Sequence, residues 1–283
     1  MSTTEPISLQ SVKASDPEMA SAPRAQIVDL FESAFNTKAD AATSADEISE
    51  RLATQLDALR VPPETLRDDE DEVDSIRWHV WSTLVASVQQ IPADNHIQDR
   101  AVAILAGLAR ATSHTNWQNL EGLEICTRDA WQDPTRSFGQ IANDDTYSAW
   151  VNLNAFMARL IAAGTVSWFE LPIWEFRDAL EESLDELSQR NKDTRLLVAV
   201  HWMRIAGKAV RDQALMGRDL DEAEARMLRG GELFAGKTGY TLERWEFWRQ
   251  RFTEAKEQVS EPVRAAVDEA LKHMVVVEGV IYR

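Results

Sequence analysis

One glycine-rich segment of the chain contains residue types that could bind a nucleotide. Residues 231 to 238 fit the pattern G-x-x-x-x-G-K-[ST] of a phosphate-binding loop. In such a loop, main-chain N–H groups and Lys237 would hold the phosphates, and Thr238 would reach Mg²⁺. A genuine phosphate loop follows a buried strand and opens a helix at its Lys-Thr end.

The residues around this motif argue against nucleotide binding. Residues 221 to 229 are rich in helix formers and include no β-branched run that would predict a strand. Gly239 follows the motif directly, whereas Thr241 is a good N-cap for a helix that begins at Leu242. We therefore interpret the segment as a connector before a Trp-rich helix, and we expect no nucleotide cofactor.

A second set of candidate chemical groups is a narrow basic stripe on an otherwise apolar helix. His201, Arg204, Lys208 and Arg211 recur at i, i+3, i+7 and i+10. Ion pairing with neighbouring carboxylates would give the stripe a structural role. Alternatively, Arg204 binds an anionic group and His201, which titrates near neutrality, donates or accepts a proton. His201 and Arg204 are therefore the candidate catalytic residues.

An acidic run at residues 68 to 72 fits the D-D-x-x-[DE] pattern with which helical terpene cyclases hold Mg²⁺ and diphosphate. The second metal motif of those enzymes, with Asn/Asp, Ser/Thr and Glu at four-residue spacings, is missing from the sequence. Because carboxylates also suit the positive start of a helix, a Mg-dependent terpene cyclase-like lyase is only a minor alternative.

Metal chemistry is not otherwise indicated. The single cysteine, Cys126, suits a small core residue in a reducing compartment, and the five histidines are too scattered to predict a zinc site. We expect neither a metal nor a cofactor.

The chain is unusually rich in tryptophan, with ten residues spread along the predicted helices. Most should be core, since Trp245 and Trp248 share an apolar edge with Leu242 and Phe252. Aromatic rings around a gap can also form the wall of a ligand pocket between helices. The candidate pocket residues are Trp150, Asn154, Trp174, Trp202 and Trp245.

The elements that must position these residues are helices. Apolar periodicity predicts them over 25–36, 45–59, a segment carrying Val73 to Val88 that Pro92 stops, 96–110, 117–131, 146–163, 172–189, 194–215, 220–229, 242–259 and 262–273. Only Met274–Val277 resembles a strand, and one strand cannot form a sheet. The predicted class is all-α: a compact multi-helix bundle of about ten helices, with an irregular α-solenoid as the alternative.

Two of these helices are expected to form a hairpin. In residues 172–189, Ile173, Phe176 and Leu180 would share one stripe with Leu184 and Leu187. The opposite, solvated face would hold the carboxylates of Glu175, Asp178, Glu182, Asp185 and Glu186. A short turn at 190–193 would then lead into the helix with the basic stripe.

Composition narrows the domain organisation and the class of partner. Residues 1–23 have little to bury and are expected to form a disordered tail, followed by a single helical domain over 24–283. The net charge of −17 opposes binding to nucleic acid or anionic membranes. With neither a membrane-length apolar run nor a signal peptide, we expect a soluble, cytoplasmic protein, with the nucleus also possible; the sequence does not determine the oligomeric state.

Several blocks of residues carry a family resemblance. They are the Gly-x-Leu-Phe-x-Gly order at 231–236, Gly239–Trp248 with its Leu-Glu-Arg-Trp-x-x-Trp core, and the blocks 152–160, 173–181 and 199–207. Over roughly residues 25 to 260 the chain resembles the fungal domain-of-unknown-function family 3632. The resemblance implies a soluble, helical fungal protein from a family without general assigned chemistry, some of whose members sit among genes for secondary metabolism. It supplies no catalytic residues.

Two functions follow as expectations. The first is a cofactor-independent enzyme or accessory protein that acts on a small hydrophobic metabolite, by isomerisation, cyclisation or dehydration, in fungal secondary metabolism. The second is a non-catalytic helical adaptor that binds a protein partner. An enclosed apolar cavity with inward polar groups would favour the first function, and a broad exposed apolar groove would favour the second.

Overall fold

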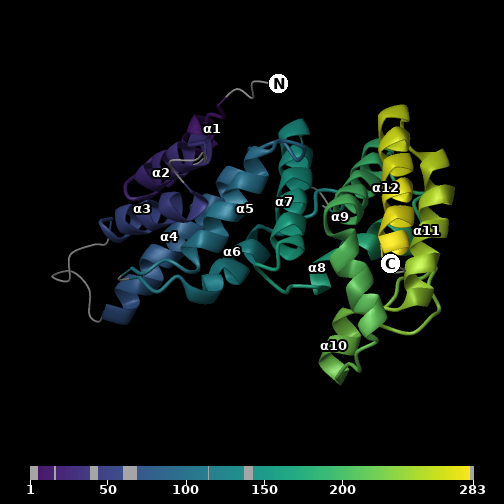
Figure 1. Cartoon of the computed structure of the whole chain (residues 1–283). Coiled ribbons are helices and arrows are strands. Elements are labelled where there is room, and N and C mark those ends of the chain that lie inside the picture. The colour runs from purple at the N-terminus through teal and green to yellow at the C-terminus, as the bar shows by residue number, and fades with distance from the viewer. Residues whose placement is uncertain are drawn as a thin grey trace. The chain divides into compact units, whose positions relative to one another are not determined.

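The computed structural model describes residues 6–15, 17–38, 44–59, 69–113, 115–136 and 143–280, without the side chains of 69–74 and 280. Within these ranges the regular elements are helices and there is no strand (Figure 1). The predicted all-α class is confirmed. The chain divides into two compact units, with unit 1 formed by residues 1–134 and 141–156 and unit 2 by 135–140 and 157–283. A single domain over 24–283 stays a prediction.

Unit 1 is a cluster of helices around an aliphatic and aromatic core. Ile27, Phe31 and Phe35 of α2 are fully buried, and the rings of Trp81 and Trp117 meet edge to face at 5.4 Å. Its elements are α1 (Gln10–Ser15), α2 (Arg24–Asn36), α3 (Ala45–Asp57), α4 (Asp69–Gln89), α5 (Ile97–Leu108), the 3₁₀ turn η2 (Gln118–Leu120), α6 (Leu123–Ala130) and the first part of α7 (Asp144–Ala162).

The N-terminal segment differs from the expected disordered tail. Residues 10–15 form α1, and Leu9 and Val12 are fully buried. The main-chain N–H of Leu9 donates to Glu32 Oε2 at 2.6 Å, which ties the segment to α2. Composition could not predict this order, because the segment is also held by partners distant in sequence, with Ile7 bonded to Asn36 and Lys13 paired with Asp29.

Unit 2 contains the end of α7 and the elements α8 (Glu170–Phe176), the π-helix η3 (Arg177–Glu181), α9 (Gln189–Met216), α10 (Glu222–Met227), α11 (Leu242–Ala255), the 3₁₀ turn η4 (Lys256–Gln258) and α12 (Glu261–Val280). The long α9 is its central element, because it packs against α8, α11 and α12 (Figure 1). Its apolar residues are accordingly buried over most of the helix, as the sequence predicted.

The predicted hairpin over 172–215 is wrong in its details. The first helix changes to π geometry at Arg177 and ends at Glu181, and Ser188 caps α9, so the expected turn at 190–193 is helical. The connection therefore lies at 182–188. Of the acidic face expected to be solvated, Glu175 and Asp178 are buried, and Asp178 forms an ion pair with Arg136.

The valine-rich end of the chain is also not extended. Residues 274–277, which resemble a strand, continue α12. Met274 and Val277 face the core while Val275 and Val276 are exposed, so helical packing decides the conformation despite the β-branched side chains.

Candidate functional site

The start of α11 fixes the position of a buried arginine. Thr241 is the N-cap, and its hydroxyl accepts the main-chain N–H of Arg244 at 3.0 Å. The helix therefore begins at Leu242, as the sequence predicted. Trp245, Trp248 and Phe252 lie in the core, and Arg244 is fully buried beside them.

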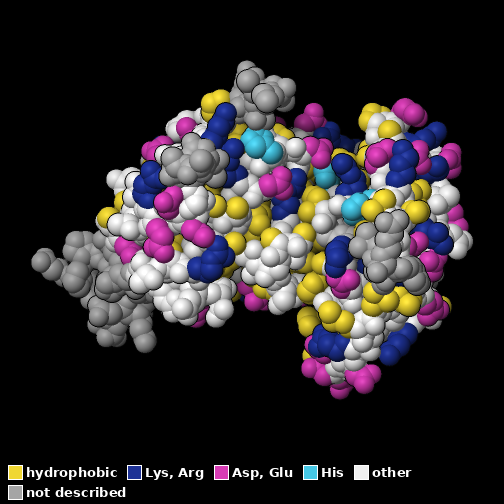
Figure 2. Space-filling view, in the orientation of Figure 1, with side chains coloured by type: hydrophobic (Ala, Val, Ile, Leu, Met, Phe, Trp, Pro, Cys, Tyr) yellow, Lys and Arg dark blue, Asp and Glu magenta, His cyan; other side chains and the backbone are white. Residues whose placement is uncertain are grey.

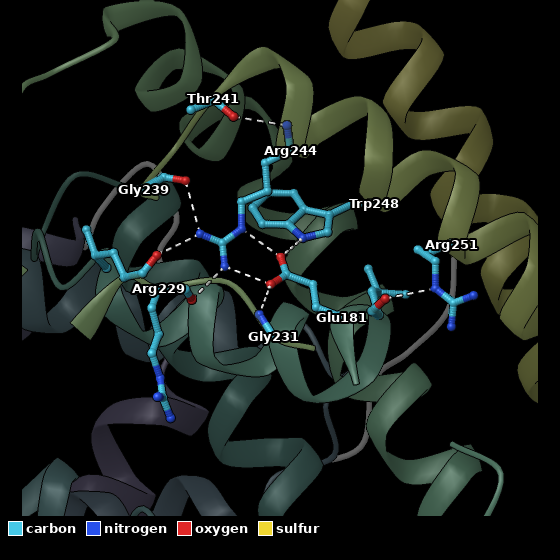
Figure 3. A network of polar contacts seen from close by, with 10 residues as sticks. Glu181, Arg229, Gly231, Gly239, Thr241, Arg244, Trp248 and Arg251 are labelled. Atoms are coloured by element: carbon cyan, nitrogen blue, oxygen red, sulfur yellow. Dashed lines mark hydrogen bonds and ion pairs between the residues drawn. The ribbon is translucent and has the colours of Figure 1, made fainter. Parts of the chain in front are cut away.

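Arg244 is paired with a carboxylate from the π-helix η3 (Figure 3). Its Nε lies 2.6 Å from Glu181 Oε1, and its Nη2 lies 2.9 Å from Glu181 Oε2. Neither side chain is exposed to solvent. Two parallel N–H···O contacts of this kind are the strongest geometry available to a carboxylate and a guanidinium.

The remaining hydrogen-bonding capacity of the pair is satisfied by its surroundings (Figure 3). Arg244 donates to the main-chain oxygens of Leu228 at 2.8 Å, Arg229 at 3.0 Å and Gly239 at 3.1 Å. These three contacts and the two with Glu181 use all of its N–H groups. Glu181 also accepts the indole N–H of Trp248 at 2.6 Å and the main-chain N–H of Gly231 at 2.8 Å.

We call Glu181, Arg244, Trp248 and Gly231 the buried ion-pair network. Because its donors and acceptors are matched to one another, we assign it a structural role, which is to hold residues 228–241 against η3 and α11. Gly231 cannot be replaced freely, since an added Cβ would lie 2.6 Å from the main-chain oxygen of Glu181.

The segment that matches the phosphate-loop pattern is thus part of this network. Its glycine N–H binds a protein carboxylate, and three nearby main-chain oxygens face a guanidinium. Lys237 is exposed, and no helix begins there. The residues before the segment form the short helix α10 where a phosphate loop would have a strand. The interpretation as a connector is confirmed.

A pocket of about 380 Å³ is lined in part by Leu228 and Tyr240, at the two ends of the segment 228–240. Its apolar wall comes from Phe169, Leu220, Met227, Leu228 and Tyr240, and its polar groups from Ser167, Glu170, Gln213, Arg218 and Glu224. This volume is within the range of small-molecule sites. In Figure 2, hydrophobic, acidic and basic side chains gather close together around α10, the helix that provides Glu224 and Met227.

Hydrogen bonds and an ion pair position three side chains of the pocket, Tyr240, Glu224 and Arg218. The Tyr240 hydroxyl donates to the main-chain oxygen of Phe169 at 2.6 Å. Burial raises the pKa of the Tyr240 phenol well above its usual range; the nearby charge of Arg244 lowers it and that of Glu170 raises it. Glu224 closes the capping box of α10 and pairs with Arg218 at 2.7 Å. The pKa of Glu224 is lowered mainly by its hydrogen bond with the main-chain N–H of Asp221 and next by its contact with Arg218.

Comparison with known proteins gives one match. Residues 81–252, more than half of the chain, match the family model DUF3632, described as a protein of unknown function. The chain belongs to the DUF3632 family. No curated protein and no solved structure matched it. The DUF3632 region includes the buried ion-pair network and every residue that lines the pocket.

Within this DUF3632 protein, the two predicted catalytic residues have different environments. His201 is buried on α9, whereas Arg204, one turn later, is exposed. Neither lines the pocket described above. Arg204 acts electrostatically on His273 of α12. The pKa of the His273 imidazole is lowered mainly by burial and to a smaller extent by the positive charge of Arg204. Catalysis by His201 and Arg204 stays a prediction.

The rest of the basic stripe serves packing and surface charge. Lys208 is exposed and pairs with Asp212 at 2.7 Å on the same helix. Arg211 is buried, with its guanidinium 5.2 Å from the centre of the Trp245 ring.

The predicted pocket residues belong to both units. Trp150 packs edge to face on Trp131, and the buried amide of Asn154 donates to the main-chain oxygen of Trp150 at 3.0 Å, both in unit 1. In unit 2, Trp202 and Trp245 are fully buried, and the Trp245 indole donates to Glu278 at 2.7 Å. The indole of Trp174 donates to the main-chain oxygen of Met227 at 3.1 Å, so Trp174 supports a residue of the pocket wall.

Two further expectations concern metals and membranes. Among the described residues, no group of three or more His, Cys, Asp or Glu side chains is arranged to hold a metal ion. In the acidic run, Asp68 lies outside the described residues, as do the side chains of 69–72. No helix in the described ranges combines the length and apolar character needed to span a membrane.

Proposed function

We propose that this protein binds a small amphipathic organic molecule in the pocket between α8, the end of α9 and α10. The observation that supports this most strongly is the composition of the pocket wall. Phe169, Tyr240 and Met227 offer a wide apolar surface, while Gln213 and Glu170 offer polar contacts to a ligand's functional group. Apolar and polar side chains line the pocket in equal number, a mixed wall that suits a ligand with an apolar body and a polar functional group.

The rigid support of the pocket favours a binding role. The main-chain oxygens of Leu228 and Gly239 accept hydrogen bonds from Arg244. Leu228 directly follows α10 and lines the pocket, and Gly239 directly precedes Tyr240, another lining residue. The buried ion-pair network therefore holds one wall in place before a ligand arrives. Such preorganisation lowers the entropic cost of binding.

The finer elements of the function are part of the same proposal. We propose that the protein is an accessory protein or a cofactor-independent enzyme of fungal secondary metabolism, and that it acts in the cytoplasm or nucleus. The link to secondary metabolism is supported by the sequence resemblance alone. The net charge of −17 supports a small molecule in preference to nucleic acid.

The test uses two exposed methionines of unit 2. Met227 is 47% exposed and lines the pocket, whereas Met216 is 68% exposed and does not. A panel of neutral and charged aromatic fragments is screened by ligand-observed NMR against the wild type, Met227→Trp and Met216→Trp. We expect binders whose signal is lost in Met227→Trp and kept in Met216→Trp. A panel without binders, or binders that Met227→Trp leaves unchanged, would contradict the proposal.

The adaptor alternative is favoured by a different observation. Leu215 and Met216 end α9 with exposed apolar side chains, and Leu215 is 44% exposed. An adaptor would use such a surface to bind a protein. Leu215→Ser combined with Met216→Ser should then abolish recovery of a partner that cross-linking detects in cells, and fragment binding in the pocket should be unaffected.

A further inference from the structure

The ionic groups around the pocket carry an excess of negative charge. Two carboxylates, Glu170 and Glu224, line it, and Arg218 is the one cationic side chain among its lining residues. Arg218 is already paired with Glu224 at 2.7 Å. The side chains that line the pocket thus include one more carboxylate than cation.

The end of α9 adds to this potential. The helix ends at Met216 with Gly217 as a left-handed C-cap, and its last turn contains no basic residue. The pocket is lined by Gln213 and Arg218, which lie on either side of that end. The last carbonyl groups of a helix lack partners within it, and the helix dipole places partial negative charge there. The C-terminus of a helix of this length thus favours a cation in the pocket.

The aromatic wall is also suited to a positive charge. Phe169 and Tyr240 both line the pocket, with ring centres 6.1 Å apart and ring planes nearly perpendicular. Aromatic faces attract ammonium groups, and the attraction increases when the cation loses water. The Tyr240 hydroxyl is engaged with a main-chain oxygen, so the ring is held in one orientation.

Resting on the function proposed above, we propose that the ligand of this pocket is a protonated amine attached to an apolar or aromatic body. The carboxylate of Glu170 and the amide oxygen of Gln213 line the pocket and are hydrogen-bond acceptors, and an amine supplies N–H donors to them. A quaternary ammonium group has the same charge but no N–H donor. The pocket should therefore prefer the primary amine.

The experiment compares compounds with the same apolar body. Phenylbutylamine, phenylbutanol, phenylbutyrate and trimethyl(phenylbutyl)ammonium are titrated into the full chain by calorimetry at pH 7. We expect the amine to bind about tenfold more tightly than the alcohol, which is the effect of one charge-assisted contact, and the carboxylate to bind most weakly.

Two substitutions separate a local contact from the general charge of the protein. Glu170→Gln should remove most of the preference for the amine over the alcohol and leave the affinity for the alcohol nearly unchanged. Glu222→Gln is the matched control, because Glu222 is an exposed carboxylate of α10 that does not line the pocket. It removes the same net charge and should keep the preference.

The outcomes distinguish this inference from the function on which it rests. If the alcohol binds and Met227→Trp abolishes that binding, the pocket is a binding site. If, in addition, the amine binds no more tightly than the alcohol, or the protein keeps its preference for the amine in Glu170→Gln, the amine inference is overturned while the proposed function stands. An equal or tighter affinity for the quaternary compound would overturn the choice of a primary amine. If none of the four compounds binds, both proposals fail.

Discussion

Neutralising Glu181, the carboxylate of the buried ion-pair network, should strongly destabilise unit 2. In Glu181→Gln, the guanidinium of Arg244 keeps its charge at a site with no solvent exposure. An amide nitrogen would also replace one carboxylate oxygen, and each oxygen accepts two N–H groups in the native structure. The two N–H groups that the lost oxygen accepted would then face the N–H groups of the glutamine amide, which cannot accept them.

The magnitude follows from the burial of both partners. Removing one member of a buried pair costs about 3 to 5 kcal/mol, because the other charge is left uncompensated. We expect a loss of about 4 kcal/mol in the free energy of unfolding, or a fall in Tm of roughly 8 to 16 °C for a protein of this size. Glu186, an exposed carboxylate five residues away, is the matched control. Glu186→Gln should change stability by less than about 0.5 kcal/mol.

The assay is urea denaturation followed by tryptophan fluorescence, to which all ten tryptophans contribute, including Trp248 of the network. A double-mutant cycle with Glu181→Leu and Arg244→Leu should give a coupling energy of about 2 kcal/mol or more. The double variant would still leave the main-chain oxygens of Leu228, Arg229 and Gly239 without Arg244. A loss below about 1 kcal/mol in Glu181→Gln, or a coupling energy of zero, would refute the structural role of the pair.

Three other predictions test neighbouring conclusions. Gly231→Ala should cost about 1 to 3 kcal/mol in chemical denaturation because its Cβ would meet main-chain oxygen, whereas Gly279→Ala, with open space at its Cβ, should not destabilise. Lys237→Ala should leave stability within about 0.5 kcal/mol, and calorimetry should detect no Mg·ATP binding in either form; micromolar affinity that the substitution abolishes would show a nucleotide site. Arg204→Gln should raise the lowered pKa of His273, measured by NMR titration. At pH values between that lowered pKa and the ordinary value of 6.5, His273 binds more protons in the unfolded state than in the folded state. The free energy of unfolding of the wild type therefore falls as the pH falls through this range, and that of Arg204→Gln should fall by less. An unchanged His273 pKa would contradict the electrostatic contact.

The sequence could predict what depends on local pattern. The start of α11 at Thr241 and the core positions of Trp245 and Trp248 follow from capping preference and apolar spacing. The all-α class follows in the same way from periodicity along the chain.

What the sequence could not predict depends on distant partners. The partner of Arg244 is 63 residues away, and nothing near Glu181 indicates that this carboxylate is buried while Glu182 is not. The apolar stripe that continues to Leu184 and Leu187 predicted an unbroken helix, but Glu181 ends it, since its main-chain oxygen accepts the N–H of Leu233. The pocket depends on the placement of residues 217–241, which contain little periodic structure.

The separation of Glu181 and Arg244 along the chain has a consequence for the order of folding. Helices α9 and α11 can form from local contacts, and Leu228 and Gly239 are at most 16 residues from Arg244, but the contact between Glu181 and Arg244 joins residues 63 positions apart. Closing a loop of this length costs chain entropy before any contact compensates for it. The network should therefore form after the folding transition state, so that weakening it accelerates unfolding and leaves the folding rate nearly unchanged. The native lifetime of the pocket would then be set by one carboxylate at the end of a π-helix.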